Sequence, residues 1–294
     1  SSAASDVYKR QVVGYEVAGR VDALGEGVDT AWQDRDVLAI SRFGGYSDVI
    51  CVPYRQVAER PPGMTADTGA AIPVNYLTAY QLVHVMGGLR SEETMLVHSA
   101  GGGVGIAAIQ LARNIGARVI GTASARKHGF LKQLGVHHCI DYRQEDFEKR
   151  VLEITNGAGV ELVLDPIGGA SFKKSYRVLA PSGRLGMFGI SSAATGKTKS
   201  LTSLVKMLAL MPWFQFTPLS LIDQNKGVFG VNLGHLWDEI ERVRNWLQAL
   251  LDLYEKGVVQ PVVDATFCFH EAAQAHHYIQ DRKNVGKVLL VPRK

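Results

Sequence analysis

The sequence predicts an α/β protein in which a parallel sheet with intervening helices is combined with a second, β-rich part. Three observations support this fold class. Apolar strands alternate with helical stretches between residues 76 and 231, a glycine-rich turn follows the first of these strands, and short strands with glycine turns occupy residues 12–60. The length of 294 residues exceeds that of a typical single domain, so we expect two domains.

The β-rich part is predicted from short strand-like runs with glycine turns. Residues 35–40 and 46–52 are two such runs, separated by Gly44-Gly45, which predicts two short strands. A loop over residues 61–64 leads to Thr65, which we expect to cap a helix. Toward the end of the chain, a long amphipathic helix over 236–256 and a strand over 288–291 are predicted, and this last strand could return to the β-rich part.

The parallel sheet is predicted from continuous apolar strands. They are expected at residues 94–98, 118–123, 138–142, 161–165 and 184–189. Apolar side chains without alternation indicate strands that are buried on both faces of a sheet. In the first intervening helix, Val104, Ala108, Leu111 and Ile115 form an apolar stripe. Strand and helix repeating in this way are typical of βαβ units in a parallel sheet.

The strongest chemical signal is the glycine-rich turn within residues 97–108, which read VHSAGGGVGIAA. A strand, a glycine turn and a helix N-terminus form the arrangement that binds a dinucleotide pyrophosphate, because the glycines allow close approach and the helix offers unpaired N–H groups. The register has two readings. Ala100, Gly102 and Gly105 give A-x-G-x-x-G, whereas Gly103, Gly105 and Ala108 give G-x-G-x-x-A. The alternative is a flexible glycine loop without a ligand.

The end of the second strand indicates which dinucleotide is bound. NAD-binding proteins usually place an Asp or Glu there for the ribose hydroxyl, but residues 121–128 read GTASARKH and contain no acid. Ser124 offers a hydrogen bond, and Arg126 and Lys127 offer charge for a 2′-phosphate. The stretch therefore favours NADP(H). The alternative for the two basic residues is that they are solvated at the start of a helix.

Several function classes are disfavoured. The net charge of +4 is spread without a basic stripe, which argues against a nucleic-acid partner. Cys51, Cys139 and Cys268 are far apart, which fits a reducing compartment and a cytoplasmic location. No apolar run approaches the length of about 20 residues that a transmembrane helix needs.

Motifs for other chemistries are not found. His270-Glu271 lacks the second His of an H-E-x-x-H zinc motif, because position 274 is Gln, and His276-His277 are adjacent, so we expect no metal site. No G-x-S-x-G nucleophile motif is present. Catalysis is therefore expected to depend on the dinucleotide.

Six segments together resemble the medium-chain dehydrogenase/reductase superfamily, and within it the quinone oxidoreductase branch and the group of synaptic vesicle membrane protein VAT-1 homologues. The segments are residues 74–80, 100–105, 121–128, 165–169, 230–234 and 284–292. The resemblance implies a Rossmann NADP-binding domain with a doubly wound parallel sheet over 76–231. It also implies a GroES-like catalytic domain built from residues 12–75 and 232–294, with its N-terminal part missing, because residues 1–11 are expected to be a non-native leader.

The resemblance further implies zinc-independent, NADPH-dependent reduction of a small-molecule quinone or α,β-unsaturated carbonyl compound by a homodimer. Zinc-dependent relatives have a Gly-His-Glu motif where this chain has Gly14-Tyr15-Glu16, and their four-cysteine zinc lobe is missing here. The alternative function is an NADPH-binding module with little catalysis that associates with a membrane or a partner.

Site residues are implied by the same resemblance, and no catalytic proton donor is identified among them. Those expected to contact the cofactor are Thr78, Ala100, Gly102, Gly103, Val104, Gly105, Ser124, Arg126, Lys127, Tyr142, Phe188, Gly189, Phe229, Val231 and Asn284. Within this set, the residues at 102–105 hold the pyrophosphate, and Lys127 and Tyr142 contact the 2′-phosphate side. Tyr46 and Thr78 are cleft candidates, and the alternative for Tyr46 is an ordinary strand aromatic.

Two further segments are expected to make contacts with other surfaces. The apolar stretch 201–216, which includes Trp213, is interpreted as a wall of the substrate pocket or a subunit contact, with a membrane-surface patch as the alternative. The strand predicted at 228–231 is expected to pair with a second copy of the chain.

Overall fold

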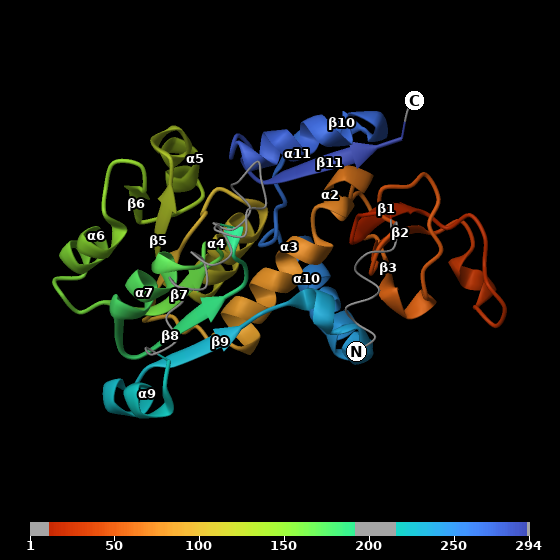
Figure 1. The fold of residues 1–294 in the computed structure, drawn as a ribbon. Helices are drawn as coiled ribbons and strands as arrows, with labels where there is room; N and C mark the ends of the chain where they lie inside the picture. Colours follow the sequence, from red (N-terminus) through yellow and green to blue (C-terminus); the bar gives the residue numbers. More distant parts are fainter. Residues whose placement is uncertain (1–11, 192–215, 293–294) are drawn as a thin grey trace, which may run out of the picture. The chain divides into compact units, whose positions relative to one another are not determined.

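The computed structural model describes residues 12–191 and 216–292 (Figure 1). It divides into two compact units. The first contains Ser1–Leu77, Leu233–Glu255 and Pro261–Lys294, and the second contains Thr78–Asn232 and Lys256–Gln260. Most of the predicted apolar stretch 201–216, including Trp213, and the predicted leader lie outside the described residues.

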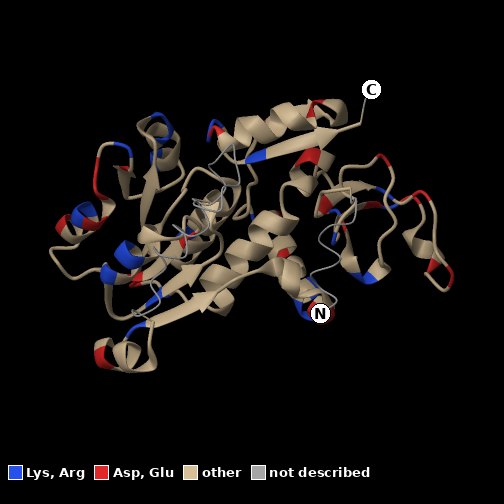
Figure 2. Ribbon diagram, viewed as in Figure 1, with Lys and Arg blue, Asp and Glu red and all other residues tan. Residues whose placement is uncertain are grey.

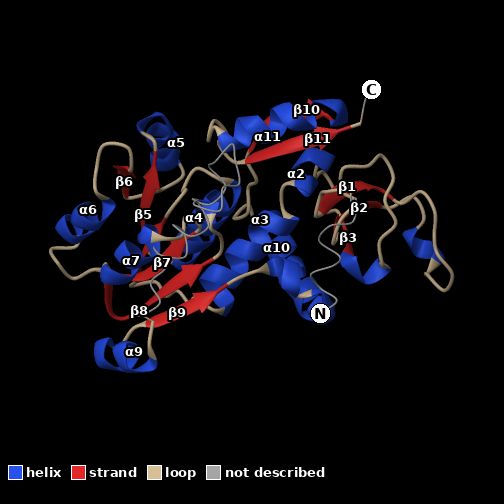
Figure 3. Ribbon diagram, viewed as in Figure 1, coloured by secondary structure: helices blue, strands red, loops and turns tan. Residues whose placement is uncertain are grey.

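The second unit is built on a six-stranded parallel sheet with the strand order β6-β5-β4-β7-β8-β9 (Figures 1 and 3). The strands are β4 (Thr94–Val97), β5 (Arg118–Ala123), β6 (His138–Asp141), β7 (Val160–Asp165), β8 (Leu179–Met187) and β9 (Gly227–Gly230). In chain order this is 3-2-1-4-5-6, the doubly wound Rossmann topology, whose direction reverses between β4 and β7. The predicted α/β fold class is confirmed.

Helices cover both faces of this sheet. They are α4 (Gly103–Ile115), α5 (His128–Gln133), α6 (Phe147–Ile154), α7 (Ala170–Arg177) and α9 (Pro218–Gln224), and a π-helix spans Gln81–Val85. Leu96, Ile120 and Leu185 form a buried cluster with residues of α6 and α7. The next residue along β8, Gly186, faces the other way, where Leu82 of the π-helix packs against it.

Local sequence explains where several helices begin and end. Asp146 caps α6 by accepting a hydrogen bond from the Glu148 N–H, and Gly116 ends α4 in the left-handed conformation. Thr65 caps α2 (Ala66–Ala70) through the Thr68 N–H, as the sequence predicts. The amphipathic helix predicted at 236–256 is α10 (Ile240–Glu255), and a 3₁₀ turn at Trp237–Glu239 precedes it.

One strand is longer than the sequence predicts. The sequence predicts a strand at residues 184–189, but β8 spans Leu179–Met187 and so includes the turn-forming run 181–183, Pro-Ser-Gly. Its register against β7 jumps from Leu179 to Arg184, and Ser182 has a φ of 65°. The turn residues therefore form a bulge inside the strand instead of ending it.

The first unit contains two small sheets. The antiparallel sheet has β1 (Glu16–Arg20), β2 (Asp36–Ile40) and β3 (Val57–Glu59), and the parallel pair is β10 (Val263–Cys268) with β11 (Lys287–Val291). Its other helices are α3 (Pro73–Tyr80), which continues into the second unit, and α11 (Ala272–Gln280). Short 3₁₀ segments lie at Thr30–Trp32, Tyr54–Gln56, Leu233–His235 and Phe269–Glu271.

The strand predicted at 46–52 is wrong, because the structure has bends and irregular backbone there. Val49 is 74% exposed, so its apolar side chain does not pack into a buried face as it would in a core strand. Instead, the Gly45 and Tyr46 N–H groups donate to the Gly14 and Val13 carbonyls.

Charged residues of both signs are interspersed over the elements of each unit (Figure 2). Buried or half-buried ion pairs connect distant segments. In the first unit, Lys287 of β11 pairs with Glu16 of β1, and the same carboxylate accepts the Val74 N–H at 2.7 Å. In this way β1, β11 and the start of α3 are held together.

Candidate functional site

The predicted cofactor residues of the second unit gather at one edge of its sheet. The glycine turn follows β4, Ser124 to Lys127 follow β5, and Tyr142 follows β6. Phe188 and Gly189 follow β8, and Val231 follows β9. Because all six strands are parallel, these positions lie at the same, carboxyl, edge. In open α/β sheets ligands bind at this edge, where the strand order reverses.

The glycine turn places an uncapped helix N-terminus at this edge. Gly102 is the N-cap of α4 and provides no side-chain cap, so the first N–H groups of the helix, at Gly103, Val104 and Gly105, have no partner within the helix. The turn is closed by a hydrogen bond of 2.9 Å from the Gly102 N–H to the Ser99 carbonyl. This arrangement is suited to an anion.

Two glycines of the turn have no room for a side chain. A Cβ on Gly105 would lie 2.5 Å from the Ser99 carbonyl oxygen and 2.7 Å from that of Ala100. A Cβ on Gly101 would lie 2.7 Å from Cδ of Lys127. Helix α4 therefore starts directly on the strand end, and the Lys127 stem covers the turn.

The end of β5 brings a basic side chain to the turn. Lys127 is only 9% exposed although it is a lysine, and Ser124 is 6% exposed. The Lys127 N–H donates to the Ser124 carbonyl at 2.9 Å, which forms the tight 3₁₀ turn Ala125–Lys127. Arg126 lies exposed on this turn, and Tyr142 is 36% exposed with Arg143 above its ring.

The loops that follow β7 and β8 lie side by side. The Ser191 N–H donates to the Pro166 carbonyl at 2.9 Å, and a Cβ on Gly189 would lie 3.1 Å from that same oxygen. Phe188 starts this loop, with its N–H 3.3 Å from the Asp165 carbonyl. The predicted residues Phe188 and Gly189 are therefore brought to the end of β7.

The remaining predicted residues are placed by β9, α3 and the first unit. Phe229 of β9 lies against Gly186, and Val231, which is 6% exposed, donates its N–H to the Met187 carbonyl. Thr78 is 9% exposed in α3. Tyr46 and Asn284 belong to the first unit.

Tyr46 pairs with His276, one of the two adjacent histidines for which no metal site is expected. Its Oη lies 3.3 Å from Nε2 of His276 on α11, and the two rings are 5.9 Å apart. Burial, with lesser contributions from Tyr15 and Glu16, raises the pKa of Tyr46 above its ordinary value. Tyr46 lies outside any strand, so its alternative as an ordinary strand aromatic is wrong.

A buried polar group at the carboxyl edge was not predicted. His98, Thr122, Asp165 and Ser175 are each at most 1% exposed and are linked by hydrogen bonds. The sequence places His98 at the end of an apolar strand. It places Asp165 at the carboxyl end of another strand, where open α/β sheets bind ligands, and a turn or helix-cap residue is the equal alternative. The contacts between them depend on the order of strands in the sheet, which no local pattern reveals.

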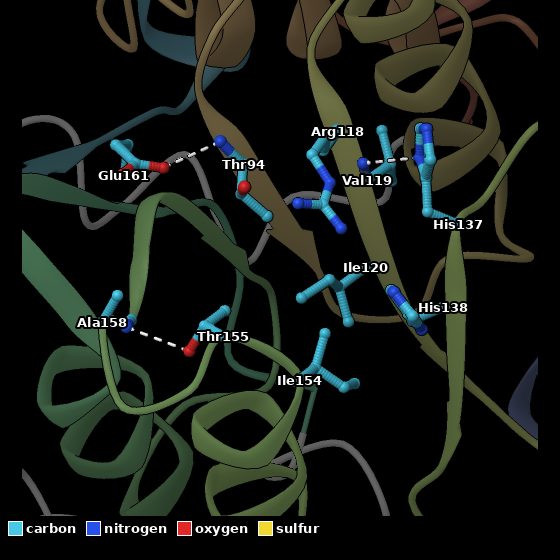
Figure 4. Close-up of a pocket in the computed structure, with 11 residues that line it drawn as sticks. Thr94, Arg118, Val119, Ile120, His137, His138, Ile154, Thr155, Ala158 and Glu161 are labelled. Carbon is cyan, nitrogen blue, oxygen red and sulfur yellow. Dashed lines mark hydrogen bonds between the residues drawn. The ribbon is translucent and has the colours of Figure 1, made fainter.

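The edge of the sheet opposite the glycine turn has a pocket of about 170 Å³. It is lined by the amino ends of β4 and β5 and by the end of α6, and Arg118 extends from β5 toward its middle (Figure 4). Glu161 places a carboxylate on the same pocket, and this carboxylate accepts the Thr94 N–H at 2.7 Å. The pocket thus offers both signs of charge and no helix N-terminus.

No group of three or more His, Cys, Asp or Glu residues is arranged to hold a metal ion within residues 12–191 and 216–292. The three cysteines are free thiols. Over the same ranges, no helix is long and apolar enough to cross a membrane.

Comparison with known proteins assigns the family. A model of the family described as zinc-binding dehydrogenase matches residues 134–290. The synaptic vesicle membrane protein VAT-1 homolog of Rattus norvegicus is 40% identical over 282 residues, which cover 95% of this chain and 69% of that relative. The chain belongs to the zinc-binding dehydrogenase family of the medium-chain dehydrogenase/reductase superfamily. The predicted resemblance is confirmed.

Two further relatives of this dehydrogenase are enzymes by name. A 2-haloacrylate reductase of Burkholderia sp is 30% identical over 286 residues, which cover 96% of this chain and 81% of the reductase. The crystal structure of Escherichia coli quinone oxidoreductase complexed with NADPH has a TM-score of 0.82 and 28% identity, and the match covers 98% of this chain and 86% of that one. The chain is therefore an oxidoreductase of the quinone oxidoreductase type.

Proposed function

We propose that this dehydrogenase reduces quinones or α,β-unsaturated carbonyl compounds by hydride transfer from NADPH, without zinc. The observation that supports this most directly is the combination at the carboxyl edge of an uncapped helix N-terminus with a β5 end that has lysine and arginine and no acid. The two relatives named above, one in complex with NADPH and one a reductase of an electron-poor alkene by name, agree with it.

The residues at the turn fit a dinucleotide. Backbone at Gly101, Gly102 and Gly105 presents no side chain toward the edge, and the α4 N–H groups favour a pyrophosphate. We assign the pyrophosphate to residues 102–105 with Ala100 behind them. We assign the 2′-phosphate side to Ser124, Arg126, Lys127 and Tyr142, because two cations and two hydroxyls suit a dianion.

The nicotinamide end is assigned to residues that follow the other strands. We propose that Phe188, Gly189, Phe229 and Val231 line this end, that Thr78 lies near the ring, and that Asn284 closes over the cofactor. Bound NADPH would supply the hydride, and the contribution of these residues is to orient the ring and exclude water. Tyr46 is proposed to line the cleft, in which the substrate carbonyl must be placed.

Binding selectivity tests this proposal. Titration with NADPH is expected to quench tryptophan fluorescence at lower concentration than titration with NADH. NADPH should then be consumed when members of a quinone and enone panel are added. Equal affinity for the two dinucleotides would contradict the assignment of the 2′-phosphate side, and zinc found at one equivalent per chain by metal analysis would contradict the zinc-free mechanism.

A second candidate function is an NADPH-binding module with little turnover that associates with a membrane or a partner. The identity of 40% to a protein named for a synaptic vesicle membrane favours it. It predicts tight NADPH binding without oxidation across the whole panel. We keep the reductase as the leading proposal because the chain is an oxidoreductase of the quinone oxidoreductase type and its carboxyl edge has an uncapped helix N-terminus that suits a dinucleotide. The free thiols fit the cytoplasmic location that we propose for either function.

We also propose that β9 pairs with β9 of a second copy. Among the described residues β8 is the only strand neighbour of β9, so the other edge of β9 is available for pairing with a strand. The Val231 N–H points to β8, so by alternation the Gly230 N–H points to the open edge. Gly230→Pro should convert a dimer in light scattering to a monomer without loss of far-UV ellipticity, and a wild-type monomer would contradict the proposal.

A further inference from the structure

A hydrogen-bonded chain of buried side chains lies directly behind the glycine turn. His98, the residue that follows β4, has Nδ1 3.0 Å from Oγ1 of Thr122 and Nε2 3.1 Å from Oγ of Ser175. Ser175 in turn donates to Oδ2 of Asp165 at 2.7 Å. All four side chains are at most 1% exposed. They connect β4, β5, β7 and α7 at the point where the strand order reverses.

The donors and acceptors of these four side chains assign a proton to Nε2 of His98. Asp165 accepts from Ser175, from Ser171 at 2.7 Å and from the Ile167 N–H at 2.7 Å. Since the Ser175 hydroxyl donates to Asp165, its oxygen is left to accept from His98 Nε2–H. Burial, partly opposed by Asp165, lowers the pKa of His98, which favours the neutral Nε2–H form. In that form Nδ1 accepts from Thr122.

These hydrogen-bonded side chains are coupled to the backbone of the glycine turn. Ser99, the residue after His98, has a φ of 53°, a left-handed conformation that is unfavourable for serine. On one side of it, the His98 N–H donates to the Leu164 carbonyl at 3.0 Å. On the other side, the Ala100 N–H donates to the Thr122 carbonyl at 3.1 Å. Thr122 therefore holds both His98 and Ala100.

The strained residue also supports the cofactor end of the turn. The Ser99 carbonyl accepts the Gly102 N–H, and it is the atom that a side chain on Gly105 would strike. A change in the orientation of Ser99 would therefore move the N-terminus of α4. Strained conformations persist only where the surroundings hold them. His98 is held by two side-chain hydrogen bonds and by an edge contact with Phe147, whose ring centre is 4.5 Å away.

We propose that His98, held by Thr122 and by the Ser175–Asp165 pair, is the positioning residue that keeps the glycine turn in the shape required to bind the dinucleotide pyrophosphate. This inference rests on the proposed function for the ligand, but the effect on the turn itself exists without the cofactor. These hydrogen bonds predict that a residue able to donate to Ser175 and to accept from Thr122 can replace His98, whereas an apolar residue of similar size cannot.

Three variants test this role. His98→Leu fills the space without hydrogen bonds, His98→Gln keeps a donor and an acceptor, and Ser175→Ala breaks the link to Asp165 with little change of volume. We expect the dissociation constant of NADPH to rise about tenfold in His98→Leu and Ser175→Ala, the size that loss of a buried hydrogen bond implies. In His98→Gln most of the affinity should be recovered.

A second measurement needs no cofactor. Hydrogen exchange of the amides at residues 101–105 should accelerate in His98→Leu and Ser175→Ala and stay close to wild type in His98→Gln. The ¹⁵N shifts of His98 should report the Nε2–H form in the free protein. If His98→Leu lowers the melting temperature while NADPH affinity and exchange of the turn match wild type, His98 is a core residue only and the proposal is overturned.

The two proposals fail in different ways. A wild-type protein that does not bind NADPH would contradict the proposed function, while protection of the turn amides would still decide the role of His98. A wild-type protein that binds NADPH as tightly as its three variants do would contradict the role of His98 alone. If His98→Leu does not fold, Ser175→Ala provides the same comparison with a smaller change.

Discussion

The amino and carboxyl edges of the six-stranded sheet both collect polar side chains, but they use them differently. At the amino edge Arg184 of β8 donates to both oxygens of Glu93 at 2.8 and 2.6 Å and to the Gly88 carbonyl at 2.9 Å. At the carboxyl edge α4 begins without a side-chain cap, and the polar side chains beneath it hold the backbone in place. Polar groups that satisfy one another stabilise the fold, whereas the helix N–H groups left open at the carboxyl edge suit the dinucleotide that we propose.

The largest expected effect is on stability at the amino edge. Arg184 and Glu93 are 15% and 16% exposed, and Arg184 also donates to the Gly87 carbonyl. Arg184→Ala leaves a carboxylate and the carbonyls of Gly87, Gly88 and Glu161 without this donor, so we expect a loss of about 3 kcal/mol in the free energy of unfolding. Urea denaturation measures it, and the NADPH dissociation constant of the folded fraction should be unchanged.

An exposed ion pair provides the matched control for Arg184. Arg177 of α7 donates to both oxygens of Glu148, at 2.5 and 2.7 Å, but its side chain is 47% exposed. Arg177→Ala should therefore cost less than about 1 kcal/mol. If the two variants lose the same stability, or if Arg184→Ala weakens NADPH binding as much as it weakens the fold, the separation of the two edges is wrong.

The second effect concerns ligand binding at the carboxyl edge. Gly105→Ala places a methyl group 2.5 Å from a backbone oxygen, so the first turn of α4 must move away from β4. We expect NADPH affinity to fall on the order of 100-fold, because the N–H groups lose their common direction. Gly129→Ala in α5 is the control, since a Cβ added at this position would have no atom within 4 Å. That variant should bind normally, and comparable weakening in both would argue against a pyrophosphate at the turn.

The third effect separates the two dinucleotides. Lys127→Met keeps the apolar stem that covers Gly101 and removes the charge. NADPH affinity should fall about tenfold, because a 2′-phosphate loses one charge-assisted hydrogen bond, and NADH affinity should stay the same. Lys132→Met, at an exposed position of α5, controls for net charge. Equal loss of affinity for NADPH and NADH would place Lys127 away from the 2′-phosphate.

The fold of the second unit could be predicted because its signals are local. Apolar runs, the glycine turn and the stripe on α4 each depend on neighbouring residues, and local sequence predicts a strand near each of the six strands of the sheet. The first unit was harder to predict. The run 46–52 predicts a strand, but the structure leaves the Val49 side chain largely exposed to solvent. Strands β10 and β11 pair with each other because of tertiary packing, which the local sequence of either segment does not reveal.

The site could be predicted where a motif has its chemistry in its own backbone. The positions of Gly102 to Gly105 and of Lys127 follow from the strand–turn–helix pattern. The hydrogen bonds that connect His98, Ser175 and Asp165 were missed, because Asp165 and Ser175 lie 67 and 77 residues after His98 in the sequence. Only the reversal of strand order brings β4 beside β7.

The smallest expected effect is a difference in the pH at which the two edges lose stability. The pKa of His98 is lowered in the fold, so below the ordinary value of 6.5 the unfolded chain binds a proton that the folded chain does not. Stability contributed by neutral His98 is therefore present above pH 6.5 and is lost as the pH falls. The loss begins as the unfolded chain takes up its proton near pH 6.5 and grows as the pH falls toward the lowered pKa of the folded chain.

Glu93 should act at lower pH. Burial raises its pKa, but hydrogen bonds from Arg184 and the Arg90 N–H outweigh burial, so the pKa lies below the ordinary value of 4.5. Its contribution is present above pH 4.5 and is lost as the pH falls toward the lowered pKa. The free energy of unfolding is measured for wild type, His98→Gln and Glu93→Gln from pH 7.5 down to pH 3.5. As the pH falls, the curve of His98→Gln should separate from that of wild type first, and the curve of Glu93→Gln should separate at lower pH. The background from His84, whose pKa burial also lowers, cancels in these differences. If both curves depart from wild type in the same pH range, the two edges do not titrate as separate networks.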